Sequence, residues 1–176
     1  MKRHYKIGLD GSGIDEFIQG IEEYQSWLRE RSKVLLQRLA EEGYQVAASE
    51  FASAQYDGTN DVQVRLEDRG DKVKAVVAVG DAALFIEFGT GITYPDDHPE
   101  AGELGMRRGE YGYKLGRLEN GWRYPMEKGA GTNGVPDPKH EGYYHTLGNP
   151  ANMPMYKSVK ELERRLPELA REVFKP

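Results

Sequence analysis

The sequence Leu84-Phe85-Ile86-Glu87-Phe88-Gly89-Thr90-Gly91 decides how this chain is organised. Its first five residues are apolar except for Glu87, and a short apolar run that ends at glycine is typical of a buried strand. Regularly periodic segments precede this stretch, whereas a region crowded with glycine, proline and tyrosine follows it. We therefore expect the core to form before Gly91 and the functional surface to lie after it.

The composition favours a single soluble domain with a small core. The chain has 176 residues, of which 38% are hydrophobic and 30% are charged, so much of its surface must be solvated or buried against a partner. The net charge of -5 argues against a protein whose main task is to neutralise nucleic-acid phosphates. The absence of cysteine excludes disulfides and thiolate metal sites. With no long apolar run, we expect no membrane span and synthesis in the cytoplasm without secretion.

A long amphipathic helix is predicted near the start of the chain. Apolar residues between positions 14 and 39 recur at three-and-four spacings, which places them on one face of a helix. Ser12 and Asp15 form a plausible capping box, and Gly43 is a natural left-handed stop. Residues 44–54 fit either a strand or a helix, and we favour a strand for their first half.

An antiparallel sheet is predicted to pack on this helix. Residues 62–67 alternate between apolar and polar, residues 68–71 form a turn, and residues 73–79 return rich in β-branched side chains, which together indicate a β-hairpin. Residues 84–88 add a further strand. The fold class is therefore α+β, with a sheet of about four strands.

The remainder of the chain is a loop region followed by a second helix. Residues 89–148 hold 13 of the 21 glycines, and we describe residues 92–150 as a long irregular loop insertion in a single 1–176 domain. Residues 156–173 have the spacing of a second amphipathic helix, in which Pro167 should cause a kink or a restart.

Glu87 is the residue with the strongest claim to unusual chemistry. Burial between Ile86 and Phe88 would raise the pKa of its carboxyl group. In a strand, however, side chains alternate, and Glu87 would point away from these two neighbours. We therefore favour a carboxylate at the rim of the sheet that accepts hydrogen bonds. For the Gly89-Thr90-Gly91 sequence, we likewise favour a tight exit from the sheet over a phosphate-binding loop.

Two other functional classes remain open at this stage. His98, His140 and His145 have no recognised zinc-binding spacing, so we predict no metal or cofactor, yet a metal-dependent hydrolase that uses Glu87 with these histidines stays an alternative. The mixture of tyrosine, tryptophan and arginine in the loop could also stack the bases of a single-stranded nucleic acid. Such residues are equally common at protein interfaces, and the acidic balance favours an interface.

The chain resembles a family of tailed-phage proteins. The sequence Phe85-Ile86-Glu87-Phe88-Gly89-Thr90-Gly91 is similar to the signature of siphophage head-to-tail joining proteins, also called tail-completion or minor tail proteins. The resemblance extends to residues 54–62 with the hairpin after them, to Gly148-Asn149-Pro150-Ala151, and to Met155-Tyr156 before the last helix. It therefore covers most of the chain apart from the loop interior.

This resemblance implies a structural virion protein of a bacteriophage or prophage that is not an enzyme. Such a subunit would form an oligomeric ring, commonly a hexamer, in the neck between the head connector and the tail tube or terminator proteins. Nucleic acid would be met only as DNA passing through the ring. Residues 87–91 would be a structural motif. The candidates for subunit or partner contacts are Tyr111, Tyr113, Trp122, Tyr124, Gly148, Asn149 and Pro150.

Overall fold

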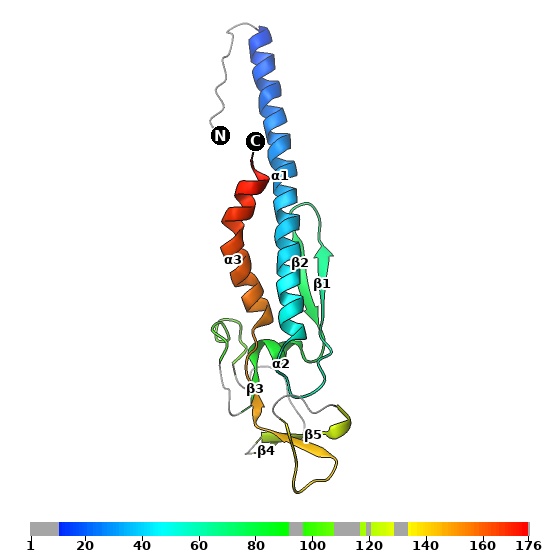
Figure 1. Ribbon diagram of the computed structural model, residues 1–176. Helices are drawn as coiled ribbons and strands as arrows, with labels where there is room; N and C mark the ends of the chain where they lie inside the picture. Colours follow the sequence, from blue (N-terminus) through cyan, green and yellow to red (C-terminus); the bar gives the residue numbers. More distant parts are fainter. Residues whose placement is uncertain (1–10, 92–96, 108–116, 119–120, 129–133, 176) are drawn as a thin grey trace.

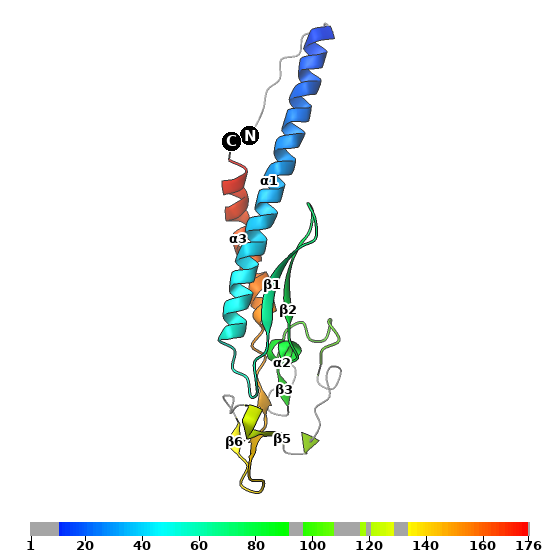
Figure 2. The same cartoon turned by 90° about the vertical axis from the view of Figure 1, so that its right-hand side faces the viewer.

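The computed structural model describes residues 11–91, 97–107, 117–118, 121–128 and 134–175. Within these ranges the protein is an elongated α+β structure built along one long helix (Figure 1). A second helix and a β-hairpin lie beside that helix, and short strands gather at its C-terminal end (Figures 1 and 2).

The long helix α1 spans Gly11–Ala52 and is about 63 Å long, at 1.5 Å per residue. Helix α3, Pro154–Val173, packs antiparallel along its second half. The rings of Trp27 and Phe174 meet near the end of α3, with their centroids 5.9 Å apart. The first half of α1 extends beyond this point and beyond the hairpin (Figure 1).

The predicted stop at Gly43 and the predicted strand after it are wrong, because α1 continues to Ala52. Gly43 instead permits close packing of the helices. A Cβ atom at Gly43 would lie 3.1 Å from Cδ1 of Leu162 and 3.3 Å from Oγ of Ser158. The Ser158 hydroxyl donates a hydrogen bond of 2.8 Å to the carbonyl oxygen of Gly43. This glycine therefore serves the contact between α1 and α3 rather than a turn.

The predicted hairpin is confirmed. Strands β1, Gln63–Asp68, and β2, Lys74–Val79, pair antiparallel with Gln63 opposite Val79. Both strands pack against α1. The sheet beside α1 has these two strands and not about four, so that part of the prediction is not confirmed in the described residues.

Residues 84–88 were expected to be a strand but lie in the short helix α2, Ala83–Phe88. Asp61 fixes the start of this helix, because its carboxylate accepts the backbone N–H groups of Asp81 and Ala82 at 2.9 and 3.0 Å. A small apolar core follows, in which Ile86 and Ala82 pack against Phe51 near the end of α1.

Short strands occupy the described parts of the predicted loop insertion. Strand β3, Thr90–Gly91, pairs antiparallel with β8, Gly148–Asn149. Four more strands pair in the order β4-β5-β7-β6, and η1, Met126–Lys128, follows β5. Their bounds are Arg117–Leu118 for β4, Gly121–Pro125 for β5, Val135–Pro136 for β6 and Tyr143–Thr146 for β7.

Helix α3 begins two residues earlier than predicted and runs through Pro167 without a restart. Pro167 is exposed, so the backbone carbonyl that loses its helical partner can bind water. The polar face of α3 carries ion pairs to α1, including Arg165 with Glu42 at 3.0 Å and Arg38 with Glu172 at 2.9 Å.

We predict that Gly43→Val lowers the free energy of unfolding by about 1–3 kcal/mol, because its side chain would press on Leu162 and Ser158. Urea unfolding followed by circular dichroism measures this change. Ser49→Val, at an exposed position of the same helix, is the control and should have little effect. Equal stability of the two variants would contradict close packing at Gly43.

Candidate functional site

The carboxylate of Glu87 lies at the centre of the junction between α2 and α3. Its side chain is only 8% exposed. Oε2 accepts the backbone N–H of Met155 at 2.8 Å, and Oε1 accepts the backbone N–H of Tyr156 at 3.0 Å. The ring Nε2 of His98 lies 3.2 Å from the same Oε1. Three donors from two distant segments therefore meet at one buried carboxylate.

This carboxylate caps the N-terminus of α3. The residue before the helix, Met153, has a left-handed backbone with φ of 58° and makes no capping hydrogen bond with its side chain. Pro154 supplies no N–H, so the first free donors are those of Met155 and Tyr156, and Glu87 accepts both. The partial positive charge at a helix N-terminus also stabilises a carboxylate. Glu87 thus performs from another helix what a local capping residue normally does.

His98 completes the surroundings of this carboxylate. Its side chain is buried, and its Nδ1 accepts the backbone N–H of Glu100 at 3.1 Å. With Nδ1 as an acceptor, a neutral ring carries its proton on Nε2 and donates it to Glu87. The ring also packs on those of Phe88 and Tyr156, with centroids 4.5 and 5.3 Å away. Both ring nitrogens are therefore engaged.

Gly89 joins α2 to β3 at a position where only glycine fits. Its φ is 75°, which side chains rarely adopt. A Cβ atom there would lie 2.7 Å from the backbone nitrogen of Ala151 and 2.9 Å from the carbonyl oxygen of Asn149. The backbones of 89–91 and 148–151 thus approach closely, as the β3–β8 pairing requires.

Asn149 links this crossing to the segment after α1. Its side chain is fully buried, its Oδ1 accepts the backbone N–H of Asp57 at 2.6 Å, and its Nδ2 donates to Oγ1 of Thr90 at 3.3 Å. Asn152 acts similarly on the same segment. Its Oδ1 accepts the N–H of Gln55 at 2.8 Å, and its Nδ2 donates to the carbonyl oxygen of Gln55 at 2.9 Å.

Asp57 connects these hydrogen bonds to the short strands. Its carboxylate is buried, accepts the backbone N–H of Gly134 at 2.7 Å, and accepts the hydroxyl of Thr146 on β7. The same hydroxyl oxygen accepts the N–H of Gly148 at 3.2 Å. No buried side-chain nitrogen or oxygen of the described residues lacks a hydrogen-bond partner. The junction is therefore a saturated polar network.

The structure places the predicted site residues in different surroundings. Residues 87–89 are buried in the junction, and Thr90 and Gly91 form β3. Among the interface candidates, Gly148 and Asn149 are buried, Pro150 is half-buried, Trp122 and Tyr124 lie on β5, and Tyr111 and Tyr113 lie outside the described residues. Whether any of the seven contacts another subunit stays a prediction.

The prediction that Glu87 accepts hydrogen bonds is confirmed, but its expected position is wrong. Glu87 is buried on a helix and does not lie at the rim of a sheet. Gly89-Thr90-Gly91 likewise follows a helix rather than leaving a sheet. Asp57 and Asn152 were not predicted as site residues, because an acidic and an amide side chain in separate loops give no local signal of a shared network.

Of the three histidines named with Glu87, His98 contacts its carboxylate, whereas His140 and His145 have other surroundings. His140 pairs with Asp137, with Nδ1 and Oδ1 3.3 Å apart, and His145 lies on β7 opposite Arg123. Burial would raise the pKa of Asp137, but hydrogen bonds from the Lys139 N–H, Arg123 and His140 lower it well below its usual range. No group of three potential metal ligands occurs among the described residues.

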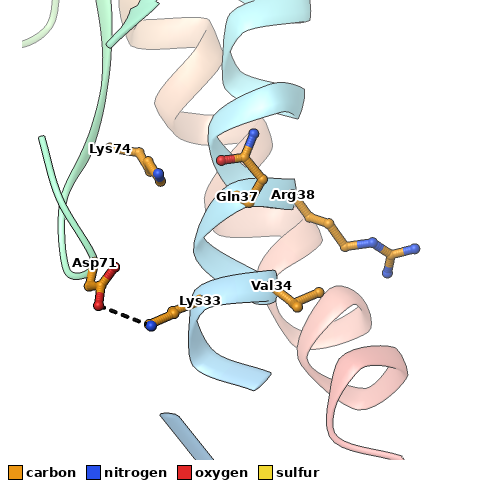
Figure 3. A pocket seen from close by; sticks show the side chains of 6 residues that line it. All are labelled: Lys33, Val34, Gln37, Arg38, Asp71 and Lys74. Carbon is orange, nitrogen blue, oxygen red and sulfur yellow. Dashed lines mark ion pairs between the residues drawn. The ribbon is translucent and has the colours of Figure 1, made fainter. Parts of the chain in front are cut away.

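Two of the hollows that border α1 lie against the hairpin. One is a shallow polar depression beside the hairpin turn, where Lys33 pairs with Asp71 at 3.0 Å and exposed Val34 lies on the helix (Figure 3). The other is an apolar groove of about 390 Å³ between β2, α2 and α3, with Glu87 and His98 among its lining residues.

Comparison of the chain with protein families, curated proteins and solved structures found no match. None of the helices in the described residues is long and apolar enough to span a membrane.

We predict that Glu87→Ala lowers the free energy of unfolding by about 3 kcal/mol, because it leaves the partly buried N–H groups of Met155 and Tyr156 without an acceptor. Glu87→Gln keeps one carbonyl oxygen and should lose only about 1 kcal/mol. Urea unfolding measures both. Hydrogen exchange should show faster opening of the first turn of α3.

The control for this prediction is Glu163→Ala, because Glu163 is an exposed residue of α3 that pairs with Lys160 on the surface. Exposed pairs of this kind contribute little to stability. If Glu87→Ala were no more destabilising than the control, Glu87 would not be a capping residue.

We also predict a loss of stability at alkaline pH that depends on Tyr56. Burial, with Asp61 and Asp57 nearby, raises the pKa of its hydroxyl from 10.0 to about 12. The unfolded chain therefore loses this proton first, and the stability from Tyr56 is complete below pH 10 and falls as the pH rises to about 12. Unfolding of Tyr56→Phe should depend less on pH in this window, and an unchanged dependence would contradict the assignment.

Proposed function

We propose that the protein is a structural component of a tailed-phage or prophage virion, a neck or tail-completion subunit that joins the head connector to the tail as an oligomeric ring. The proposal begins from the resemblance of residues 85–91, 148–151 and 155–156 to proteins of that class. It includes a location in the virion and the absence of catalytic activity.

One structural observation supports the proposal above the others. The segments that carry the resemblance are far apart in the sequence, yet they meet in a single junction. Asn149 accepts the N–H of Asp57, Glu87 accepts the N–H of Met155, and Thr90 pairs with Asn149 in the sheet. If the chain shares the architecture of that family, the residues that carry the resemblance are expected to meet in one junction.

The chemistry of the junction favours an architectural role. A general base must reach a substrate proton, whereas the Glu87 carboxylate is buried and already accepts three hydrogen bonds. The apolar groove beside it is lined largely by aliphatic and aromatic side chains. A buried carboxylate that accepts three hydrogen bonds holds the segments of its donors together.

The runner-up is a metal-dependent hydrolase that uses Glu87 with His98, His140 or His145. Metal analysis of the purified protein separates the two classes. Stoichiometric zinc or manganese that is lost in His140→Ala would replace the structural proposal. Binding of a single-stranded oligonucleotide that weakens in Trp122→Ala and in high salt would favour the third class, a nucleic-acid-binding protein.

We predict that deletion of the gene from its phage or inducible prophage gives separate heads and tails in electron micrographs of the lysate. A wild-type copy supplied in trans should restore joined particles and infectivity. A copy carrying Glu87→Ala should restore them poorly, whereas a copy carrying Glu163→Ala should restore them fully. Normally joined particles in the deletion strain would overturn the proposed function.

A further inference from the structure

The hairpin beside α1 has an open edge at β2. The Arg69 N–H donates to the carbonyl oxygen of Val73, so hydrogen-bonded pairs alternate from that point along the regular register of β1 and β2. Val76 and Ala78 therefore direct their N–H and C=O groups away from β1. None of the backbone hydrogen bonds found between described residues uses these outward groups. An edge of this kind can accept a further strand.

The apolar groove between β2, α2 and α3 borders this edge. Val76, Val77 and Ala78 all line the groove. Successive side chains of a strand point to opposite faces, so a groove that contacts three consecutive residues reaches the edge of the strand. Across the groove lie Leu84 of α2 and Val159 of α3, which are 45% and 50% exposed.

The hairpin is too narrow to cover both long helices. Strands lie about 4.8 Å apart and packed helices about 8–10 Å apart, so two strands cover roughly one helix. Strands β1 and β2 accordingly pack on α1 (Figures 1 and 2). Leu166 follows Val159 by seven residues on the same face of α3 and is 43% exposed. A third strand beside β2 would cover this face.

The start of the chain has the sequence pattern of such a strand. Residues 1–10 lie outside the described residues. In the sequence, Tyr5, Ile7 and Leu9 alternate with Lys6 and Gly8, which places three apolar side chains on one face of an extended segment. We call residues 2–10 the arm.

The arm is too short to reach the groove of its own chain. Gly43 lies beside Val76 and follows Gly11, the first residue of α1, by about 48 Å at 1.5 Å per residue. Ile7 stands four residues before Gly11 and can extend at most about 14 Å from it. An arm that enters this groove therefore belongs to a second copy of the chain.

We propose that the arm of one copy adds to β2 of a second copy as a third strand, antiparallel to β2. The outward N–H and C=O groups of β2 then pair with the arm, with Ile7 opposite Val76 and Tyr5 opposite Ala78. The apolar side chains of the arm enter the groove, and Lys6 points away from it.

Charge sets the direction of the arm. Lys2 and Arg3 make its first residues basic. The end of the groove at the C-terminal end of β2 carries exposed carboxylates, because Asp81 follows β2 and Glu100 lines the groove. In the antiparallel register Lys2 lies beside Asp81, whereas a parallel arm would bring its basic residues to Lys74. Charge complementarity of this kind fixes the orientation of a partner.

The inference does not rest on the proposed function, because the arm contact is a property of the purified chain. Each copy offers one arm and one groove. Such contacts close either as a two-fold pair or as a ring, and both use the same pairing of arm and β2. The tests below measure that pairing, whatever the outcome of the deletion experiment.

The first test uses the absence of cysteine in the native chain. Lys6 and Val77 form a non-hydrogen-bonded pair in the proposed register, with Cα atoms about 4.5 Å apart. Lys6→Cys combined with Val77→Cys should therefore give disulfide-linked oligomers under mild oxidation.

The matched control is Lys6→Cys combined with Arg65→Cys. Arg65 lies opposite Val77 on β1, one strand farther from the arm, at about 10 Å from Lys6. This chain should form few linked oligomers on a non-reducing gel. Equal cross-linking of the two chains, or a disulfide within one chain, would overturn the proposal.

The second test is the mass of the chain by light scattering over a range of concentrations. We expect a multiple of the 19.9 kDa chain mass at high concentration. Ile7→Gln combined with Leu9→Gln should give the monomer mass with unchanged helical circular dichroism. His4→Gln combined with Gly8→Gln alters the other face of the arm and should leave the assembly intact. A wild-type chain that stays monomeric would overturn the proposal.

The third test exchanges the charges at the end of the groove. Lys2→Glu and Asp81→Lys should each weaken assembly about threefold, because each places like charges together. The double variant restores opposite charges and should recover most of the affinity. If the double variant were weaker than both single variants, the antiparallel direction of the arm would be wrong.

Discussion

The Glu87 carboxylate at the start of α3 is the interaction on which the rest of the structure depends. Helix α3 begins without a capping side chain of its own, and its first available N–H groups are both accepted by Glu87. The same carboxylate holds His98, and the backbone of Glu87 and Ile86 accepts the N–H groups of Met153 and Asn152. A charge buried without donors would be strongly unfavourable, so α2, α3 and the segment at His98 must assemble together.

Long periodic segments were predictable from the sequence because their structure is decided locally. The apolar spacing of α1 and α3 and the alternation of the β1–β2 hairpin persist over enough residues to define a helix or a strand. The short apolar run at 84–88 was not, since five residues fit either period and Asp61, some twenty positions earlier, accepts the N–H groups of the two residues before the helix. The prediction that the first helix ends at Gly43 was wrong for a related reason, because the side chains that pack against Gly43 lie on α3.

The candidate site was likewise predictable only in part from the sequence. Glu87 could be recognised as a hydrogen-bond acceptor from its apolar neighbours, but its partners depend on the crossing of β3 and β8. The amides of Asn149 and Asn152 reach back more than ninety positions to Asp57 and Gln55. Contacts of such separation leave no periodic pattern, and they close only when the elements that carry them are already packed.

The distribution of polar and apolar groups gives this chain two regions of different character. The junction buries charged and amide groups in fixed geometry, and saturated networks of that kind favour one conformation over its competitors. The exposed isoleucines of α1 lie about 50 Å from the core residue Phe51, at 1.5 Å per residue, and no described element covers them. These isoleucines therefore lie at the opposite end of α1 from the buried core and the junction.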